Sequence, residues 1–322
     1  MVQLKYDTEI DLGNMNTSHA LMADMVGGNK RVLDVGCSTG YIARALVDRG
    51  CVVSGLEQDP VAAAEAEPYL DQLVVADLET TDLGEAFGAG KYDVVLFGDV
   101  LEHLRDPLAV LRKARPLLAP RGSVIASIPN VAHGSVRLAL LRGRFDYQPL
   151  GLLDETHLRF FTRRSLEAMF RDAGLVAVEI RRTTTGLFEG HVPLDESEYP
   201  PELVETVLED PEALTYQFVV RGVDDDADMA LRALQAREQA QREQILDIER
   251  RLAATEQDRD AAMARAEELD SQVRSLEERV APLSGDLESA RHELSQVMET
   301  RVIRYTRPLR DAYSSLRQTR SR

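Results

Sequence analysis

Four residues in the middle of the chain carry side chains that can move protons. Asp99, Glu102 and His103 are spaced at i, i+3 and i+4, which would place them together on one helical turn. His157 follows later, just before a helix expected to begin near residue 163. Because imidazoles and carboxylates can take a proton from a hydroxyl group, we predict catalytic roles for Glu102, His103 and His157. The alternative is structural, with His103 a hydrogen-bonded helix histidine and Glu102 an exposed acid.

A second group of residues predicts a ligand-binding turn. Asp34 lies in an apolar run that leads into Gly36, Cys37 and Gly40, and a helix is expected from Tyr41. A strand that enters a glycine-bearing turn and then a helix can bring backbone N–H groups close to a ligand. Alone this pattern is a weak signal, because every Rossmann-like turn shares it.

Residues after the next two apolar runs strengthen that prediction. Glu57 closes the second run, where a carboxylate can accept hydrogen bonds from both hydroxyls of a ribose. Asp77 and Leu78 follow the third run, where an aspartate can accept from an adenine amino group and a leucine can pack on the ring. We therefore expect a nucleoside-containing cofactor at these strand ends.

The elements that must position these residues alternate along residues 1–222. Short Val/Ile/Leu runs alternate with helical patterns, which predicts an α/β domain with helices on both faces of a mainly parallel sheet. We expect a Rossmann-like sheet of seven strands that ends in an antiparallel hairpin. The expected strands are Arg31–Val35, Val52–Glu57, Leu73–Ala76, Tyr92–Phe97, Ser123–Ile128, Val176–Arg182 and Tyr216–Val220. The expected helices are Thr17–Val26, Tyr41–Arg49, Pro107–Leu118 and Arg163–Ala173.

These motifs, in this order, resemble class I S-adenosylmethionine-dependent methyltransferases, above all the branch with ubiquinone-biosynthesis and sugar O-methyltransferases. The resemblance covers about residues 1–222 and implies S-adenosylmethionine as cofactor. Ser38 stands where the family often has a glycine. A dehydrogenase is the competing interpretation, but the spacing from Gly36 to Gly40 departs from the G-x-G-x-x-G pattern of NAD-binding turns. The residues that we assign to the cofactor are Asp34, Gly36, Cys37, Gly40, Glu57, Asp77, Leu78 and Asp99.

The same resemblance implies a metal site. Ubiquinone-type and small-RNA 2′-O-methyltransferases have a similar acid-x-x-Glu-His turn, which in them binds a divalent ion. By that likeness Asp99, Glu102, His103 and His157 would hold Mg²⁺ or a similar ion, and histidine ligands leave its identity open. The alternative without a metal makes His103 or His157 the general base.

The segment between residues 128 and 161 is too long for a simple link from a strand to a helix. We expect it to form a lid that recognises the acceptor. Its arginines, Arg137, Arg142 and Arg144, are expected to meet an anionic acceptor such as a phosphorylated sugar. The alternative is that they face water.

Residues 223–300 are predicted to form a coiled coil. Sixteen of twenty positions in an unbroken 3–4 spacing from Leu231 to Val297 are apolar. A strict seven-residue repeat of this length favours helices that wind around one another, and so a homo-oligomer. The alternatives are a single helix in solvent and a disordered charged arm. Pro282 and Gly285 are expected to mark a kink or a break between two helical segments.

The last segment, residues 301–322, contains seven arginines and one aspartate among apolar residues. This composition predicts a basic amphipathic tail that lies on an anionic membrane surface or docks on a protein. The stretch 304–310 looks like the tail that follows coiled coils in bacterial polysaccharide-cluster methyltransferases and glycosyltransferases, which suggests a glycosyltransferase partner. A disordered arginine-rich end is the alternative.

Composition narrows the function. The net charge of −17, most of it in residues 1–222, argues against general nucleic-acid binding. Two cysteines, no disulfide framework and no N-terminal apolar signal predict a cytoplasmic protein, peripheral at the inner face of the membrane if the tail binds lipid.

Together these features lead us to expect an oligomeric O-methyltransferase. Its expected acceptor is a sugar hydroxyl of a bacterial surface polysaccharide or its precursor. Two alternatives stay open: the same chemistry on a small-molecule or natural-product acceptor, and a coiled-coil scaffold whose cofactor domain is vestigial.

Overall fold

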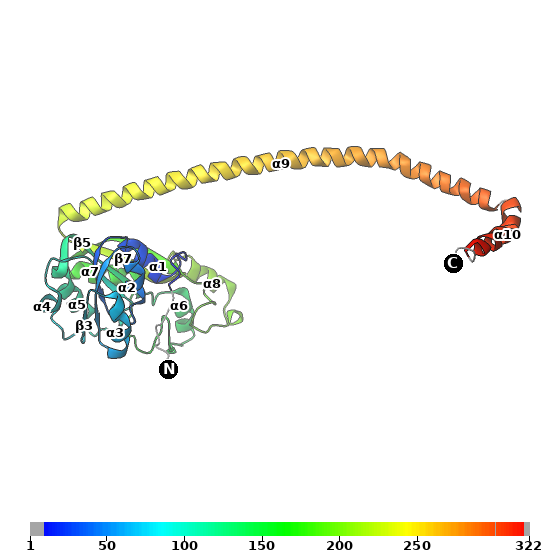
Figure 1. Cartoon of the computed structure of the whole chain (residues 1–322). Helices are drawn as coiled ribbons and strands as arrows, with labels where there is room; N and C mark the ends of the chain where they lie inside the picture. The colour runs from blue at the N-terminus through cyan, green and yellow to red at the C-terminus, as the bar shows by residue number, and fades with distance from the viewer. Residues whose placement is uncertain (1–9, 300, 319–322) are drawn as a thin grey trace. The chain divides into compact units, whose positions relative to one another are not determined.

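The computed structural model describes residues 10–299 and 301–318. The chain divides into two compact units, an amino-terminal unit, Met1–Gln241, and a carboxy-terminal unit, Arg242–Arg322. The expected Rossmann-like sheet and the long helix that follows it are confirmed (Figure 1), and the coiled coil stays a prediction.

The amino-terminal unit is built on one sheet of seven strands in the order β3-β2-β1-β4-β5-β7-β6. Neighbouring strands from β3 to β5 are parallel, whereas β7 runs antiparallel between β5 and β6, as the hairpin prediction required. The strands are β1 (Arg31–Val35), β2 (Val52–Glu57), β3 (Gln72–Val75), β4 (Tyr92–Gly98), β5 (Leu118–Pro129), β6 (Leu175–Thr184) and β7 (Thr215–Asp224).

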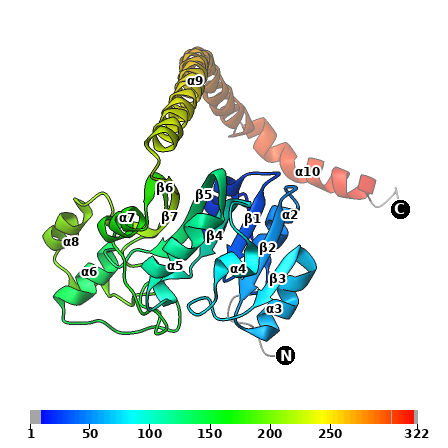
Figure 2. The same ribbon diagram turned by 90° about the vertical axis from the view of Figure 1, so that its left-hand side faces the viewer.

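Helices cover both faces of this sheet (Figure 2). On one face, α1 and α2 pack against β1, β2 and β4 in a cluster that includes Met22, Ile42 and Leu46. On the other face, α4, α5 and α7 pack around Phe97, Leu111 and Phe170. The helices of this unit are α1 (Ser18–Val26), α2 (Tyr41–Val47), α3 (Pro60–Ala66), α4 (Leu83–Phe87), α5 (Pro107–Ala114), α6 (Gly134–Leu141), α7 (Arg163–Asp172) and α8 (Pro201–Leu208).

Because helices cover both faces, the inner strands are buried along most of their length, and this explains their continuous apolar runs. The strand order reverses between β1 and β4, since β1 leads outward to β2 and β4 leads the other way to β5. In open α/β sheets such a reversal leaves a crevice beyond the carboxyl ends of the strands. The turn after β1 and the loop after β4 therefore meet at one edge.

Two long segments extend this edge on the side of β5 and β7. Residues 130–162 contain α6, and residues 185–214 contain α8. The two helices lie side by side (Figures 1 and 2) and share a separate apolar cluster that contains Leu138, Leu187 and Val207. The predicted insertion is thus a small packed layer with its own core.

The carboxy-terminal part consists of two helices, α9 (Ala227–Glu299) and α10 (Arg301–Gln318). We expected a kink or a break near Pro282 and Gly285; no break occurs, because α9 continues through both residues, and the kink stays a prediction. A proline inside a helix removes one backbone hydrogen bond without necessarily ending the helix. No helix in the described ranges is long and apolar enough to cross a membrane. The partners expected for the tail stay a prediction.

Candidate active site

The turn after β1 depends on Gly36 and Gly40. The N–H groups of Gly36 and Cys37 both donate to Leu56 O, at 2.7 and 3.1 Å, which holds the turn against β2. Gly36 has φ 77°, and a Cβ there would lie 2.6 Å from Val100 Cγ2 in the loop after β4. A side chain at Gly36 would therefore strain the backbone and clash with Val100 where the two loops meet.

The backbone of Cys37 forms hydrogen bonds within the turn, and its place in the cofactor site stays a prediction. Its N–H donates to Leu56 O and its C=O accepts from Gly40 N at 2.9 Å. Its buried thiol lies against Gly55, where a Cβ would come within 2.8 Å of the sulfur. Cys37 therefore builds the turn.

The neighbouring Ser38 has φ 48°, in the left-handed region that favours glycine. This backbone conformation gives a physical reason why a glycine suits the position. The Ser38 N–H donates to Glu57 Oε2 at 2.9 Å, so the strained residue ties the turn after β1 to the acid that ends β2.

Glu57 is held in place by three backbone groups. Besides Ser38 N, its carboxylate accepts from Gln58 N at 2.8 Å and from Asp59 N at 2.9 Å, both at Oε1. Each carboxylate oxygen has two lone-pair sites. Oε1 already accepts two of these hydrogen bonds and Oε2 one, so one site on Oε2 remains for a ribose hydroxyl.

Asp34 is buried in β1, with 2% of its surface exposed, and its Oδ2 has no hydrogen-bond partner among the described residues. Burial, with a smaller contribution from the charge of Glu57, raises the pKa of Asp34 to about 7. An unpartnered buried carboxyl next to a glycine turn is the acceptor that a cationic ligand group requires.

Asp77 and Leu78 have different surroundings. Asp77 is exposed beyond the end of β3, and its Oδ1 accepts from Glu79 N at 2.8 Å. Leu78 is buried in the core cluster that contains Phe87. The structure thus places Asp77 beside the edge and uses Leu78 for packing within the domain.

Glu102, His103 and His157 come together, as the sequence predicted. Their ligand-type atoms all lie within 4.8 Å of one another, and the two imidazole rings are edge to face with centroids 4.8 Å apart. The short helical turn η2, Leu101–His103, presents the first two residues. The later segment is fixed to this turn because Leu158 N and Arg159 N both donate to Glu102 O, at 2.9 and 3.0 Å.

The Glu102 carboxyl is buried, and neither of its oxygens has a hydrogen-bond partner in the part of the chain that the structure describes. Burial, with additional repulsion from Asp99 and Asp154, raises the pKa of Glu102 well above its usual range. Burial and the neighbouring His103 lower the pKa of His157. Both shifts favour neutral side chains in this cluster.

Asp99 does not belong to this cluster, which corrects the expected four-ligand set. It precedes η2 with φ 54°, so it does not share a helical turn with Glu102 and His103. Its Oδ1 accepts from Ser127 Oγ at 2.7 Å and from Gln217 Nε2 at 2.9 Å. Asp99 thus lies between the cofactor turn and the histidine cluster, where it contributes charge.

Sequence reasoning missed several residues on this edge. Ser127 and Gln217 fix Asp99, and a hydrogen bond of 2.8 Å joins Tyr216 Oη to His191 Nδ1. Burial raises the pKa of Tyr216 to about 12. The sequence does show polar residues near the ends of β5 and β7. Their place at the site could not be predicted, because local patterns do not show that these two strands pair.

Comparison with known proteins agrees with this geometry. A family described as methyltransferase domain matches residues 17–180. A ubiquinone biosynthesis O-methyltransferase of Psychrobacter arcticus is 30% identical over 180 residues, which cover 54% of this chain and 70% of that protein. The chain belongs to the S-adenosylmethionine-dependent methyltransferases.

Other similar proteins carry related descriptions. A ubiquinone biosynthesis O-methyltransferase of Stutzerimonas stutzeri is 28% identical over 186 residues, covering 56% of this chain and 79% of that protein. The solved structure of a SAM dependent methyltransferase from Archaeoglobus fulgidus has a TM-score of 0.48 and 15% identity, and covers 66% of this chain and 94% of that chain.

The residues of the methyltransferase fit its cofactor. The unpartnered Oδ2 of Asp34 can accept from the ammonium group of a methionine moiety, and Glu57 Oε2 can accept from a ribose hydroxyl. Val100 of the loop after β4 can pack directly against position 36 because a glycine there has no Cβ. S-adenosylmethionine, when bound, supplies a methyl group already activated by a sulfonium, so the protein has mainly to position the nucleophile.

Three arginines of the insertion are engaged within the protein, contrary to the prediction that they meet an anionic acceptor. Arg137 pairs with Asp210 at 2.6 Å, and Arg144 donates to Glu198 Oε2 at 3.3 Å and to Tyr199 Oη at 3.0 Å. Arg142 donates to the Glu198 carbonyl, and its guanidinium lies 5.4 Å from the centre of the Tyr199 ring. Their charges are engaged within the insertion.

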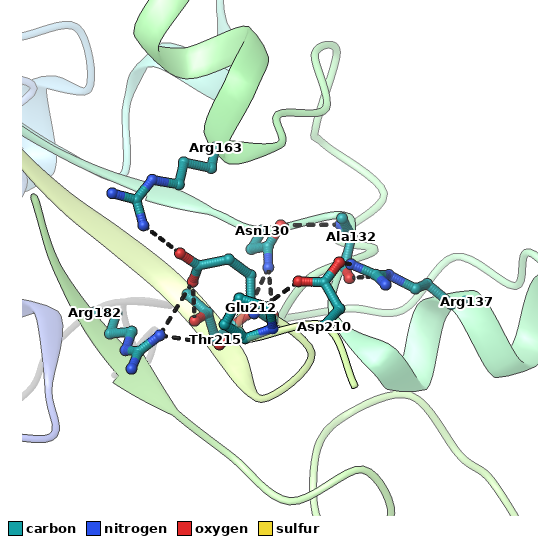
Figure 3. A network of polar contacts seen from close by, with 9 residues as sticks. Asn130, Ala132, Arg137, Arg163, Arg182, Asp210, Glu212 and Thr215 are labelled. Carbon is teal, nitrogen blue, oxygen red and sulfur yellow. Dashed lines mark hydrogen bonds and ion pairs between the residues drawn. The ribbon is translucent and has the colours of Figure 1, made fainter. Parts of the chain in front are cut away.

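Figure 3 shows how this polar network fixes the turn before β7. The buried Asn130 side chain donates to Thr215 O at 2.8 Å and to Glu212 O at 3.3 Å, and accepts from Ala132 N at 3.0 Å. Arg163 and Arg182 both pair with the Glu212 carboxylate. The turn that leads to β7 is therefore fixed by contacts with α7, with β6 and with the start of the insertion.

Proposed function

We propose that this methyltransferase transfers the methyl group to a hydroxyl, and that Glu102, His103 and His157 act on that hydroxyl. The observation that supports this most directly is their convergence beside the cofactor edge, with ligand-type atoms within 4.8 Å of one another. The relatives named O-methyltransferases agree with an oxygen acceptor.

An aliphatic hydroxyl is a poor nucleophile until its proton is removed. A neutral histidine can take that proton, and the lowered pKa of His157 keeps it neutral near physiological pH. Asp99, fixed by Ser127 and Gln217, can stabilise the resulting imidazolium electrostatically. General-base assistance of this kind contributes roughly 100- to 10,000-fold in rate.

We propose, as the alternative to this general-base route, that the same three side chains hold a divalent ion, because a histidine nitrogen that binds an ion cannot also take the proton. Two histidines and a buried carboxylate with unpartnered oxygens form a donor set suited to Mn²⁺, Fe²⁺ or Zn²⁺ more than to Mg²⁺. Such an ion would supply Lewis acidity to the acceptor oxygen.

Calorimetric titration with MnCl₂ tests the metal proposal apart from activity. We expect binding by the wild-type chain, loss of binding in Glu102→Gln, and unchanged binding in Glu155→Gln, an exposed acid nearby. The proposal fails if the wild type binds no Mn²⁺ and its activity is unaffected by EDTA.

For the acceptor, we propose a sugar hydroxyl of a bacterial surface polysaccharide or its precursor. A row of edge-to-face rings leads outward from His157 through Phe160 and Phe145 to Tyr147, with centroids 6.3, 5.5 and 5.6 Å apart. Tyr147 is 55% exposed. Rings beside polar side chains suit an acceptor that carries both apolar faces and hydroxyls, as a sugar does. Because the lid arginines are paired internally, recognition should centre on the sugar.

A phenol is the second candidate acceptor, because the similar proteins are named for ubiquinone biosynthesis. The test is transfer of radiolabelled methyl from S-adenosylmethionine to methyl glycosides of common bacterial sugars and to catechol, measured side by side. Transfer to glycosides supports the first proposal, and transfer to catechol alone supports the second. Binding of S-adenosylmethionine without transfer to either probe would reject both acceptor classes.

A further inference from the structure

The apolar residues of α9 form a row that one chain leaves uncovered. Within the described part of α9, the large apolar side chains at the predicted contact positions from Ile245 to Leu294 are at least half exposed. They are Ile245, Ile248, Leu252, Leu269, Val273, Leu276, Val280, Leu283, Leu287 and Leu294. So long an apolar row in solvent marks an interaction surface.

We propose that α9 pairs with α9 of a second copy of this chain in a parallel, in-register coiled coil. The row repeats every seven residues. On a straight helix with 3.6 residues per turn such a row would move gradually around the surface, whereas in two helices wound around each other it stays on the side that faces the partner. The partner must therefore present the same kind of row, as an identical chain does.

Charged residues beside the row support a second copy in parallel orientation. Each heptad is lettered a to g with Leu231 as a position a, so that contact residues fall at a and d. In a parallel pair, the g residue just before each a faces the e residue five positions later on the partner. Four such pairs carry a charge on both sides. Three have opposite signs, namely Arg251 with Glu256, Arg265 with Asp270 and Asp286 with Arg291, and one, Arg237 with Arg242, has like signs.

An antiparallel pair would instead bring e positions together. Between residues 249 and 277, four of the five e positions are acidic, and none is basic. The five e positions are Glu249, Glu256, Met263, Asp270 and Glu277. Like charges would therefore meet along the middle of the helix, and this repulsion disfavours the antiparallel arrangement.

Two polar residues, Thr255 and Arg259, occupy contact positions between Ile245 and Leu294, and both are compatible with this pairing. Arg259 occupies a contact position, but its guanidinium donates to Asp260 Oδ1 at 2.9 Å. A long side chain can keep its stem in the contact row while its charge stays outside. Polar residues at such positions also disfavour shifted registers at some cost in stability.

Disulfide cross-linking of the full-length chain tests the orientation and register. Val273→Cys lies in the row, and Ser271→Cys, two residues away, lies on the outer face and is the matched control. In a parallel in-register pair the Cα atoms of position 273 in the two copies would come within roughly 4.4–6.8 Å of each other, the range that a disulfide spans. The native Cys37 and Cys51 are buried and give little background.

Under mild oxidation we expect a covalent dimer from Val273→Cys and almost none from Ser271→Cys. A monomeric mass by light scattering at high concentration would overturn the proposal. So would an oligomer in which position 273 does not cross-link.

Charge reversal gives an independent test. In a parallel pair, Glu256→Arg replaces two attractions with two repulsions, and we expect the dissociation constant to rise roughly 5- to 30-fold by sedimentation equilibrium. Combining it with Arg251→Glu should restore most of the affinity. In an antiparallel pair the single change would remove repulsion, so tighter association of Glu256→Arg would refute the proposal.

Discussion

At the scale of residues, Asp34 shows how a binding group can lower the stability of the protein that carries it. Its pKa is raised to about 7 by burial, whereas an aspartate in an unfolded chain titrates near about 3.9. Between these values the folded state binds a proton that the unfolded state does not bind. Stability therefore falls as the pH rises from about 4 to about 7, and the loss persists above that range.

Replacing Asp34 with Asn should remove this loss. In the absence of S-adenosylmethionine, we expect Asp34→Asn to be more stable than the wild type at pH 8, by up to about 4 kcal/mol. The difference should shrink to less than about 1 kcal/mol near pH 4, because the wild-type carboxyl is then protonated in the folded state and about half protonated in the unfolded state. Urea unfolding of both proteins at pH 4.5, 6 and 8 measures it, and a pH-independent difference would contradict the assignment.

The same substitution should weaken cofactor binding, since the neutral amide cannot balance a cationic ammonium group. Glu57 should behave similarly at the ribose. For Glu57→Ala we expect a loss of affinity for S-adenosylmethionine of roughly 10- to 100-fold, the range for hydrogen bonds to a charged group. Glu65→Gln, an exposed acid on α3, is the control. Calorimetry decides, and equal affinities for wild type and Glu57→Ala would exclude the ribose role.

At the scale of elements, the strand ends were predictable because burial makes them continuous apolar runs. Arg31–Val35 and Val52–Glu57 were placed correctly to the residue, and with them Asp34, Gly36 and Glu57. The turn from Asp99 to His103 was predicted as one helical turn, but only a three-residue helix forms, after a left-handed Asp99. Ser127 and Gln217 fix that residue from other strands, and contacts so distant in sequence leave no local pattern.

The insertion gives a second example of contacts that are too distant in sequence to be predicted from local patterns. We predicted that its arginines bind an external anion. Their acidic partners lie up to 73 residues away in the chain, so the local sequence did not show that these charges are paired. Only the fold brings Asp210 to Arg137 and Glu198 to Arg144.

Comparison of two glycines separates the effect of backbone strain on stability from the effect of a steric clash. Gly36 and Gly90 both have φ near +70°, but a Cβ at position 90 would meet nothing within 4 Å, whereas one at position 36 would meet Val100 at 2.6 Å. We expect Gly36→Ala to lose stability and most affinity for S-adenosylmethionine. Gly90→Ala should lose only the roughly 1–2 kcal/mol that a left-handed residue costs. Thermal unfolding and calorimetry on both variants test this, and matching losses would show that the contact does not matter.

At the scale of the whole molecule, the two units should unfold separately. The amino-terminal unit has its own buried core, whereas α9 of a single chain exposes its apolar row. Helices gain most of their stability from packing of their apolar face. If α9 is stabilised by a second copy, its melting temperature should rise with protein concentration, while that of the amino-terminal unit should not.

Leu269→Asp places a charge in the row, where it would meet its own copy across the pair. We expect this variant to be monomeric, with the concentration-dependent helical transition followed by circular dichroism shifted to lower temperature. Ser271→Asp, on the outer face, should keep the wild-type mass and transition. Both should bind S-adenosylmethionine as the wild type does, because the cofactor residues lie in the amino-terminal unit. A Leu269→Asp protein that keeps the wild-type mass would show that the apolar row of α9 does not hold the copies together.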